Sequence, residues 1–285
     1  MNMVLRPVTS VAPDFAPGRV IRVYGMRRSG NHAVLDAFLR NAPGGDAVFF
    51  NNCKRAQDPL GSHRSLDIRQ GGAKVQAAGL PLGEALALAG PTPLTIVSCE
   101  DMMPRPDARA IWHDEEQTVL IYRRFLNWAA SLLQKIKGNS GYGAVERMRI
   151  MTRACRSYTV ALQIASGRED VVPVLYDRWI ASDTYRADRM AAIGLEPHDL
   201  DLGEVQRYGR GSSFQPEVRD AAELGADKRA ELLAGDPEFG ILLWLVAHDF
   251  ELSELIAAHF PQDAARILQL AETAGLTFHL PEAGR

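Results

Sequence analysis

A glycine-spaced loop near the N-terminus is the strongest candidate for chemistry in this chain. The sequence GMRRSGNH begins at Gly25, directly after the apolar run VIRVY, and leads into the helix-like AVLDAFLR. Gly25 and Gly30 keep the spacing of the phosphate-binding pattern G-x-x-x-x-G-K-[ST], in which backbone N–H groups surround a phosphate. The N–H groups at the helix start, the helix dipole and the side chains of Arg27 and Arg28 all favour an anion there. The loop is therefore predicted to bind a phosphate-like group.

The end of this loop departs from the pattern that nucleoside triphosphatases use. Asn31 and His32 stand where the pattern has Lys and Ser or Thr. A neutral amide therefore replaces the cation that reaches the terminal phosphate, and an imidazole replaces the hydroxyl that holds Mg²⁺. The loop suits an anion but is a poor match for a Mg²⁺-bound nucleoside triphosphate.

A second candidate is the sequence YRRFLNWAAS, which again runs from an apolar strand into a helix. Arg123 and Ser131 lie eight residues apart in it and could close on a phosphate from the loop and the first helical turns. The alternative interpretation is a surface arginine pair beside a helix that carries Trp128 in the core.

Together, these two motifs resemble the nucleotide signatures of the sulfotransferases that use 3′-phosphoadenylyl sulfate (PAPS). In that family the first loop holds the 5′-phosphosulfate, and Arg28, Ser29 and Gly30 match its Lys/Arg-Ser-Gly core. The second motif holds the 3′-phosphate through an Arg and a Ser eight residues later, a separation that Arg123 and Ser131 keep. The resemblance implies PAPS as sulfuryl donor, adenosine 3′,5′-bisphosphate as product and no required metal.

A third segment enters through the same resemblance. Late in such sulfotransferases a basic, glycine-containing loop closes over the 3′-phosphate, and YGRGSSF offers Arg210, Gly211 and Ser212 for that role. A plain flexible loop is the alternative. The predicted cofactor-binding residues are Gly25, Arg27, Arg28, Ser29, Gly30, Asn31, His32, Arg123, Ser131, Arg210, Gly211 and Ser212. The chain departs from many members of the family at Arg124 and Phe125, where they have Asp-Pro.

Candidate general bases follow the apolar run LTIVS, in the sequence SCEDMMP. Sulfuryl transfer needs an acceptor hydroxyl or amine that loses its proton as it attacks, and a carboxylate whose pKa is raised by burial can take that proton. Glu100 and Asp101 are the leading candidates, although either carboxylate could instead cap the next turn. His32 and His63 are alternatives, and the predicted catalytic set is Arg28, Glu100, Asp101 and His32.

The sequence therefore predicts a sulfotransferase that acts on a hydroxyl or amine. A kinase or NTPase of the phosphate-loop type, with Asp177 as a Mg²⁺ ligand, is one alternative, and a noncatalytic nucleotide-binding protein is another. The segment from Asn41 to Pro93 is expected to form loops around the acceptor, which is predicted to be a saccharide or glycolipid. Aromatic and basic residues available there are Phe49, Phe50, Lys54, Arg55, Arg64 and Arg69.

The elements that position these motifs alternate between strand and helix. Short apolar runs are predicted as strands at residues 20–24, 94–98, 118–122 and 171–176. Helices are predicted at residues 33–40, 144–166 and 182–193, over one or two segments in 238–260, and around 264–274. The helix at 182–193 is expected to have Ser182 or Asp183 as its N-cap and Gly194 as its stop. This order predicts an α/β fold of the P-loop/sulfotransferase type, a three-layer, doubly wound parallel sheet with helices on both faces. Residues 1–18 are expected to be an irregular lead-in, and 19–285 one domain with a helical C-terminal part.

Composition limits the partners. The chain has 285 residues, 46% of them hydrophobic, and a net charge of −3, which argues against a general nucleic-acid binder. Its three cysteines are far apart and form no C-x-x-C pair, so a reducing cytoplasm is expected. The sequence contains no apolar stretch of the roughly 18 residues that a spanning helix needs, so no transmembrane segment is expected.

Overall fold

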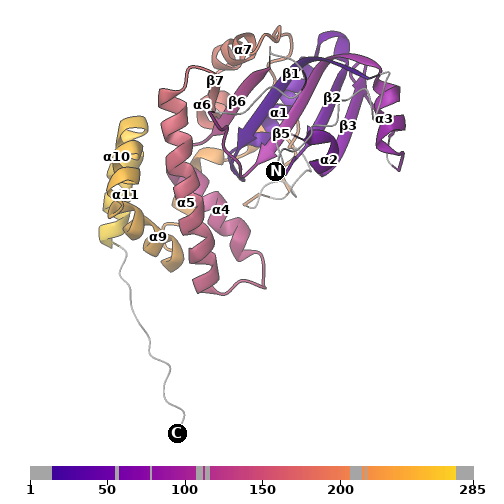
Figure 1. Cartoon of the computed structure of the whole chain (residues 1–285). Coiled ribbons are helices and arrows are strands. Elements are labelled where there is room, and N and C mark those ends of the chain that lie inside the picture. Colours follow the sequence, from indigo (N-terminus) through magenta and orange to yellow (C-terminus); the bar gives the residue numbers. More distant parts are fainter. Residues whose placement is uncertain are drawn as a thin grey trace. The chain divides into compact units, whose positions relative to one another are not determined.

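The computed structural model of the chain contains two compact units (Figure 1). The structure describes residues 15–54, 58–77, 79–106, 112, 116–205, 214–215 and 217–273. The first unit takes Met1–Arg123 and Gln163–Leu224, and the second takes Arg124–Leu162 and Gly225–Arg285. That residues 19–285 act as one domain stays a prediction.

In the described part, the first unit contains a seven-stranded sheet with the order β4-β3-β2-β5-β1-β6-β7 (Figure 1). The strands are β1 (Ala16–Gly25), β2 (Ala47–Asn51), β3 (Ser65–Gln70), β4 (Ala73–Val75), β5 (Pro91–Glu100), β6 (Gln117–Tyr122) and β7 (Val171–Leu175). β2, β5, β1, β6 and β7 pair in parallel, as predicted for an α/β fold. The placement of helices on both faces of the sheet stays a prediction.

The edge of the sheet differs from the expected all-parallel arrangement. β3 pairs antiparallel with β2, and β4 pairs antiparallel with β3. Between β3 and β4 the chain turns through Gly71 and Gly72, whose φ angles are 54° and 80°. Two residues with positive φ form the tight hairpin turn that only an antiparallel pair can use. Much of the segment from Asn41 to Pro93, expected to be loops, therefore completes the sheet.

Strand β1 begins four residues before the predicted start, Val20. Its first residues pair with β5, from Ala16 opposite Pro91 onward, and this pairing outweighs the irregular sequence around Pro17. Gly18 makes the pairing possible, because a Cβ there would lie 2.5 Å from the Thr92 carbonyl oxygen. β1 is the strand at which the strand order reverses, since β5 and β2 lie on one side and β6 and β7 on the other. Ligands of such sheets bind beyond the carboxyl end of the strands at this point.

The helices of the first unit are α1 (Asn31–Arg40), α2 (Pro59–Ser62), α3 (Leu82–Ala89), α6 (Tyr176–Ala181) and α7 (Asp183–Ala192). α1 confirms the predicted helix and buries an apolar face that includes Phe38, whose ring meets Trp179 edge-on at 5.8 Å. The predicted cap of α7 is also confirmed, because Ser182 Oγ accepts a hydrogen bond of 3.2 Å from the Tyr185 N–H. Gly194, with φ 73°, follows the helix as its stop.

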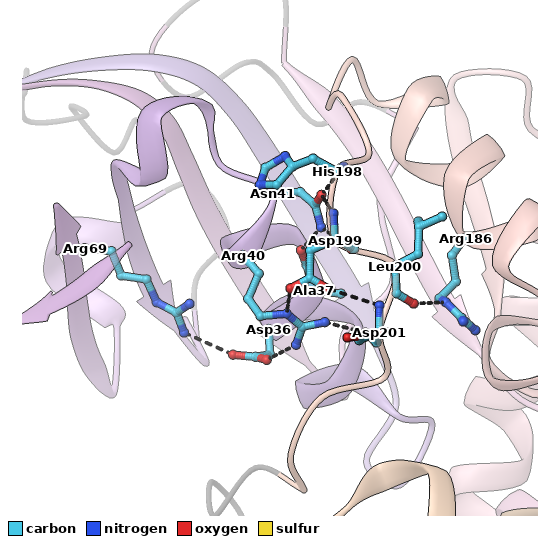
Figure 2. A network of polar contacts seen from close by, with 10 residues as sticks. All are labelled: Asp36, Ala37, Arg40, Asn41, Arg69, Arg186, His198, Asp199, Leu200 and Asp201. Atoms are coloured by element: carbon cyan, nitrogen blue, oxygen red, sulfur yellow. Dashed lines mark hydrogen bonds and ion pairs between the residues drawn. The ribbon is translucent and has the colours of Figure 1, made fainter. Parts of the chain in front are cut away.

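A polar network fixes the end of α1 to the segment that follows α7 (Figure 2). The Asn41 side-chain oxygen accepts hydrogen bonds from the N–H groups of His198 (2.8 Å) and Asp199 (2.9 Å). Its amide nitrogen donates to the carbonyl oxygens of Ala37 (2.8 Å) and Asp199 (2.7 Å). Arg40 adds an ion pair with Asp199 at 2.7 Å. One asparagine thus joins two segments that are far apart in the sequence.

The second unit is helical. It holds α4 (Phe125–Lys137), most of α5 (Ala144–Gly167), α8 (Arg229–Leu232), α9 (Pro237–Ala247), α10 (Phe250–His259) and α11 (Pro261–Thr273). All but the short α8 confirm predicted helices. Trp128 is fully buried, as the alternative interpretation of this motif expected, and stacks on Tyr158 with ring centroids 4.7 Å apart. Arg123 is also buried, so it is not the surface arginine of that interpretation. Across the described residues, no helix combines the length and apolar character needed to cross a membrane.

Candidate functional site

The predicted motifs of the first unit meet at the carboxyl edge of its sheet. Gly25, the last residue of β1, lies in register with Glu100 of β5 and with Ile121 of β6. Beyond this point the Asp101 N–H donates a 2.9 Å hydrogen bond to the Gly25 carbonyl oxygen. The segments that follow β1, β5, β6 and β7 therefore leave the sheet at the same edge, because these strands run in parallel.

The loop between β1 and α1 contains two left-handed residues. Arg28 has φ 71° and Gly30 has φ 89°, and the Ser29 N–H donates to the Met26 carbonyl oxygen at 3.2 Å. The left-handed conformation costs a non-glycine residue about 1–2 kcal/mol. Such strain persists only where the surrounding structure holds it, and it is concentrated at functional sites. The conformation of Arg28 therefore marks this loop as the candidate site.

Both glycines of the loop are required by close contacts. A Cβ on Gly25 would lie 2.3 Å from the Asn31 side-chain oxygen. A Cβ on Gly30 would lie 2.1 Å from the Tyr176 ring. The glycine spacing predicts the loop but not its contact with Tyr176. The apolar run at 171–176 predicts Tyr176 as the end of a strand, whereas in the structure it begins α6.

Asn31, a predicted cofactor ligand, binds the loop itself. Its side chain is buried, and its amide nitrogen donates to the Met26 carbonyl oxygen at 3.1 Å. The residue at the Lys position of the nucleoside triphosphatase pattern thus holds the loop in shape.

Two arginines predicted from separate motifs lie together. The Arg123 side chain is buried, and its guanidinium donates to the Arg28 carbonyl oxygen at 3.4 Å. Arg123 also lies over the Tyr176 ring at 5.5 Å and faces Asp177 at 3.9 Å. Burial and, after it, the charge of Arg123 lower the pKa of Arg28. The charge of Arg123 therefore disfavours the charged form of the Arg28 side chain, and a bound anion would offset that repulsion.

Ser29 adds an unsatisfied hydroxyl to the loop. The residue is fully buried, and Oγ has no hydrogen-bond partner among the described residues. A buried hydroxyl without a partner costs about 1–3 kcal/mol, a cost that an oxygen of a bound ligand would remove.

Asp101 has a structural contact that its prediction as a base did not include. Its Oδ1 accepts a 2.9 Å hydrogen bond from the Arg27 N–H, and its carboxylate forms an ion pair with the Arg27 guanidinium. Asp101 has φ 59°, so its own backbone is strained in this position. Arg27 and Asp101 therefore fix the start of the loop to the end of β5. Asp101 caps this loop, and not the turn that follows β5 as the alternative interpretation expected.

Glu100 is the better general-base candidate. Its side chain is half-buried, and the Asn52 amide donates to its Oε2 at 3.4 Å. Burial and the neighbouring Asp101 raise the pKa of Glu100, while Arg27, Arg28 and Arg64 act in the opposite direction. A carboxyl group with a raised pKa is a stronger base once it is ionised.

The two histidine candidates have different surroundings. Burial and the charges of Arg28 and Arg64 lower the pKa of His32, which keeps its imidazole neutral. A neutral imidazole in the first turn of α1 can exchange a hydrogen bond with a ligand. The His63 ring contacts the Pro59 carbonyl oxygen at 2.8 Å and packs edge-on against Phe50, which gives it a packing role.

Ser131 belongs to the second unit, where it has a cationic partner. The hydroxyl is fully buried in α4 and accepts a 2.7 Å hydrogen bond from Arg229 of α8. The Asn127 side-chain oxygen accepts a second bond between these helices from the Ala230 N–H, at 3.3 Å. Sequence reasoning missed Arg229, because it lies 98 residues from Ser131 and in no motif. A hydroxyl beside a guanidinium is a donor set that suits a phosphate.

The remaining predicted residues, Arg210, Gly211 and Ser212, lie outside the described residues. No family model matches this chain, and a search of curated proteins returns no match.

Proposed function

We propose that this protein is a PAPS-dependent sulfotransferase, which moves a sulfuryl group from PAPS to a hydroxyl or amine acceptor. The observation that carries the proposal is the contact between Arg28 and Arg123, at the ends of β1 and β6. The resemblance assigns these arginines to opposite ends of one doubly phosphorylated nucleotide. The guanidiniums of two arginines, one from the loop after β1 and one from the end of β6, can neutralise phosphate charge without a divalent ion.

In the proposed reaction the acceptor oxygen or nitrogen attacks the sulfur atom of PAPS. The bond between sulfur and the bridging oxygen of the 5′-phosphate breaks, and the acceptor proton passes to the Glu100 carboxylate. Negative charge develops on the bridging oxygen and the leaving phosphate, where Arg28 and the loop N–H groups bind it more strongly than in the ground state. The Ser29 hydroxyl donates to the same phosphosulfate group, and adenosine 3′,5′-bisphosphate leaves.

The contacts of Asn31 and Asp177 support a donor without Mg²⁺. The Asn31 amide is directed to the Met26 carbonyl oxygen, so it supplies no charge to a terminal phosphate. Asp177, the Mg²⁺ ligand of the kinase alternative, faces the Arg123 guanidinium at 3.9 Å. A carboxylate next to a cation is a poorer ligand for Mg²⁺ than one without it.

A thermal-shift experiment tests the nucleotide half of the proposal. Adenosine 3′,5′-bisphosphate at 100 times its Kd adds about 2.7 kcal/mol of stability, whereas ATP with Mg²⁺ at equal concentration is expected to add little. The comparison variant is Ser131→Ala, which should lose part of the shift, because the resemblance assigns Ser131 to the 3′-phosphate. Stabilisation by ATP and Mg²⁺ alone would favour the kinase alternative and sink the proposal.

Turnover separates an enzyme from a noncatalytic binder. With PAPS and a panel of saccharide, glycolipid and phenol acceptors, adenosine 3′,5′-bisphosphate should be released only when an acceptor is present. We propose a saccharide or glycolipid acceptor and a cytoplasmic location, in which the three cysteines stay reduced. Binding of the nucleotide with no sulfation of any acceptor would favour the noncatalytic alternative.

A further inference from the structure

The side of Glu100 that faces β2 is framed by two backbone segments. Asn52, which follows β2 with φ 50°, donates from its side chain to Glu100 and from its N–H to Ser98 Oγ at 2.8 Å. The Arg64 N–H donates to the Asn51 carbonyl oxygen at 2.8 Å. The backbone of Arg64 is therefore held beside Asn51, the last residue of β2. The next residue, Asn52, contacts Glu100.

Arg64 presents a cation to this side of the site. Its side chain is exposed, and its guanidinium forms no ion pair with a carboxylate among the described residues. Its charge acts on both Glu100 and His32: it opposes the rise that burial causes in the pKa of Glu100, and it adds to the fall that burial causes in the pKa of His32. Arg28 acts on the same two groups from the loop after β1. The two arginines thus reach one pair of candidate catalytic groups from different elements.

Three other arginines at this edge already have roles. Arg27 is paired with Asp101, and Arg28 and Arg123 are assigned to the nucleotide. Arg64 differs, because it lies beside the end of β2 and not in the nucleotide loop after β1. On this side of Glu100 the proposed reaction needs the sulfuryl acceptor and not PAPS. A guanidinium there suits a planar carboxylate or a phosphate, which it can bind with two parallel hydrogen bonds.

We infer that the acceptor carries an anionic group, a carboxylate or a phosphate, which binds Arg64 while the acceptor hydroxyl faces Glu100. This inference rests on the proposed function and names the acceptor class of the same site. Asn52 has a positioning role in it, since its amide contacts the Glu100 carboxylate and its backbone adjoins the strand end that holds Arg64.

Matched acceptor pairs test the inference with PAPS and the full chain. The pairs are methyl glucuronide against methyl glucoside, hydroxybenzoate against hydroxybenzyl alcohol, and glycerol phosphate against glycerol. In each pair only one member is anionic, and the third pair separates phosphate from carboxylate. We expect kcat/KM for the anionic member to exceed that of the neutral one by about tenfold or more, as for a charge-assisted contact.

Variants locate the preference. Arg64→Ala should reduce the ratio between anionic and neutral members to about two- or threefold, and Arg64→Lys should keep part of it. Arg153→Ala, which removes an exposed arginine from α5, is the matched control and should leave the ratio unchanged. The inference would be overturned if the neutral member of each pair had the same kcat/KM as the anionic member, or if Arg64→Ala did not lower the ratio of the two values. Either result would leave the sulfotransferase proposal intact.

A binding measurement distinguishes the two failures. In the presence of adenosine 3′,5′-bisphosphate, the anionic members should raise the melting temperature of the wild type more than that of Arg64→Ala. If the nucleotide stabilises the protein but no anionic member adds to it or is sulfated, the inference fails alone. If the nucleotide neither binds nor turns over, the proposed function fails and the inference falls with it.

Discussion

Arg28 combines backbone strain with a charge that is costly to hold. Its φ of 71° is unfavourable for a residue with a side chain, and its guanidinium is half-buried beside that of Arg123. Neither feature contributes to stability by itself. Both become understandable if the folded protein exchanges stability for a position in which the guanidinium stabilises developing charge.

Arg28→Gly separates these two effects. Glycine adopts a positive φ without strain, so the melting temperature should stay unchanged or rise. Loss of the guanidinium should lower kcat by about 10²–10³-fold, as for other groups that stabilise transition-state charge. Ser131→Ala should instead mainly raise KM for PAPS, because the resemblance assigns this residue to the 3′-phosphate. Steady-state kinetics with PAPS check both; equal, small effects in the two variants would contradict this division of roles.

Glu100 gives a prediction about pH. The pKa of Glu100 is raised, so the folded state disfavours its ionised form, and the wild type loses stability as the pH rises from the ordinary Glu pKa of about 4.3 through the raised pKa. Glu100→Gln, which cannot ionise, should therefore melt higher than the wild type near neutral pH, by on the order of 2 °C. Its advantage should shrink as the pH falls toward about 4.

The same substitution should lower activity. We expect kcat/KM of the wild type to rise with pH as Glu100 loses its proton. The kcat/KM of Glu100→Gln should be lower by about 10²–10⁴-fold and should no longer rise with pH. Melting curves and rates across the pH range measure the two effects. A variant that is less stable at neutral pH, or that keeps the rising profile, would exclude Glu100 as the base.

At the scale of elements, the loop after β1 depends on a contact from α6. Gly30 and Gly79 have φ angles of 89° and 87°, but only Gly30 has a neighbour in the way, the Tyr176 ring. Gly79→Ala should therefore cost only the conformational penalty of about 1–2 kcal/mol. Gly30→Ala should cost more and should weaken adenosine 3′,5′-bisphosphate binding at least tenfold. Urea denaturation and calorimetric titration compare the pair; equal losses of stability and unchanged affinity would show that the tyrosine contact does not shape the loop.

The other end of α1 depends on Asn41. Its side chain makes four hydrogen bonds in a largely buried position (Figure 2). Asn41→Ala leaves several backbone groups without partners and should lower the free energy of unfolding by about 2 kcal/mol or more. Asn139→Ala, which removes one exposed bond to the Gly141 N–H, is the control and should cost less than about 1 kcal/mol. Urea denaturation measures both variants, and equal losses would contradict the role given to Asn41.

Local patterns predicted these elements better than they predicted contacts between them. The apolar run before Gly25, the glycine spacing and the cap at Ser182 each lie within a few residues, so the sequence displays them directly. The segment from Asn41 to Pro93 was misjudged, because the buried strand AVFFN is short and is surrounded by glycine and charged residues. Periodicity needs a longer run than this strand offers.

The contacts that shape the candidate site join residues distant in the chain. Asp101 accepts a hydrogen bond from the N–H of Arg27, which lies 74 residues away in the sequence. Arg123 donates one to the carbonyl oxygen of Arg28, which lies 95 residues away. Motif reasoning selected all four residues, but only the pairing of strands in the sheet shows which of them touch. The sequence does not reveal Tyr176 and Arg229 as site residues, because their relevance comes from contacts with distant parts of the chain: Tyr176 with Gly30, and Arg229 of α8 with Ser131 of α4.

At the scale of the whole molecule, the anion site is local. The chain carries a net charge of −3, so its overall field does not attract an anionic nucleotide. The attraction must come from short-range contacts with guanidiniums that are partly or fully buried, such as those of Arg28 and Arg123. Mobile ions screen buried charges much less than exposed ones.

This distribution of charge predicts a weak dependence on salt. Between about 50 and 200 mM NaCl the Kd of adenosine 3′,5′-bisphosphate should rise only a few-fold, whereas a protein that binds through many exposed phosphate contacts loses about 10³–10⁵-fold. Calorimetric titrations at the two salt concentrations measure the change in Kd. As a control, binding of double-stranded DNA to the protein is measured in the same way, and none is expected at the higher salt concentration. A hundred-fold loss of nucleotide affinity would mean that binding depends on a wide, exposed basic surface. Arg28 and Arg123, at the ends of β1 and β6, would then not be its main determinant.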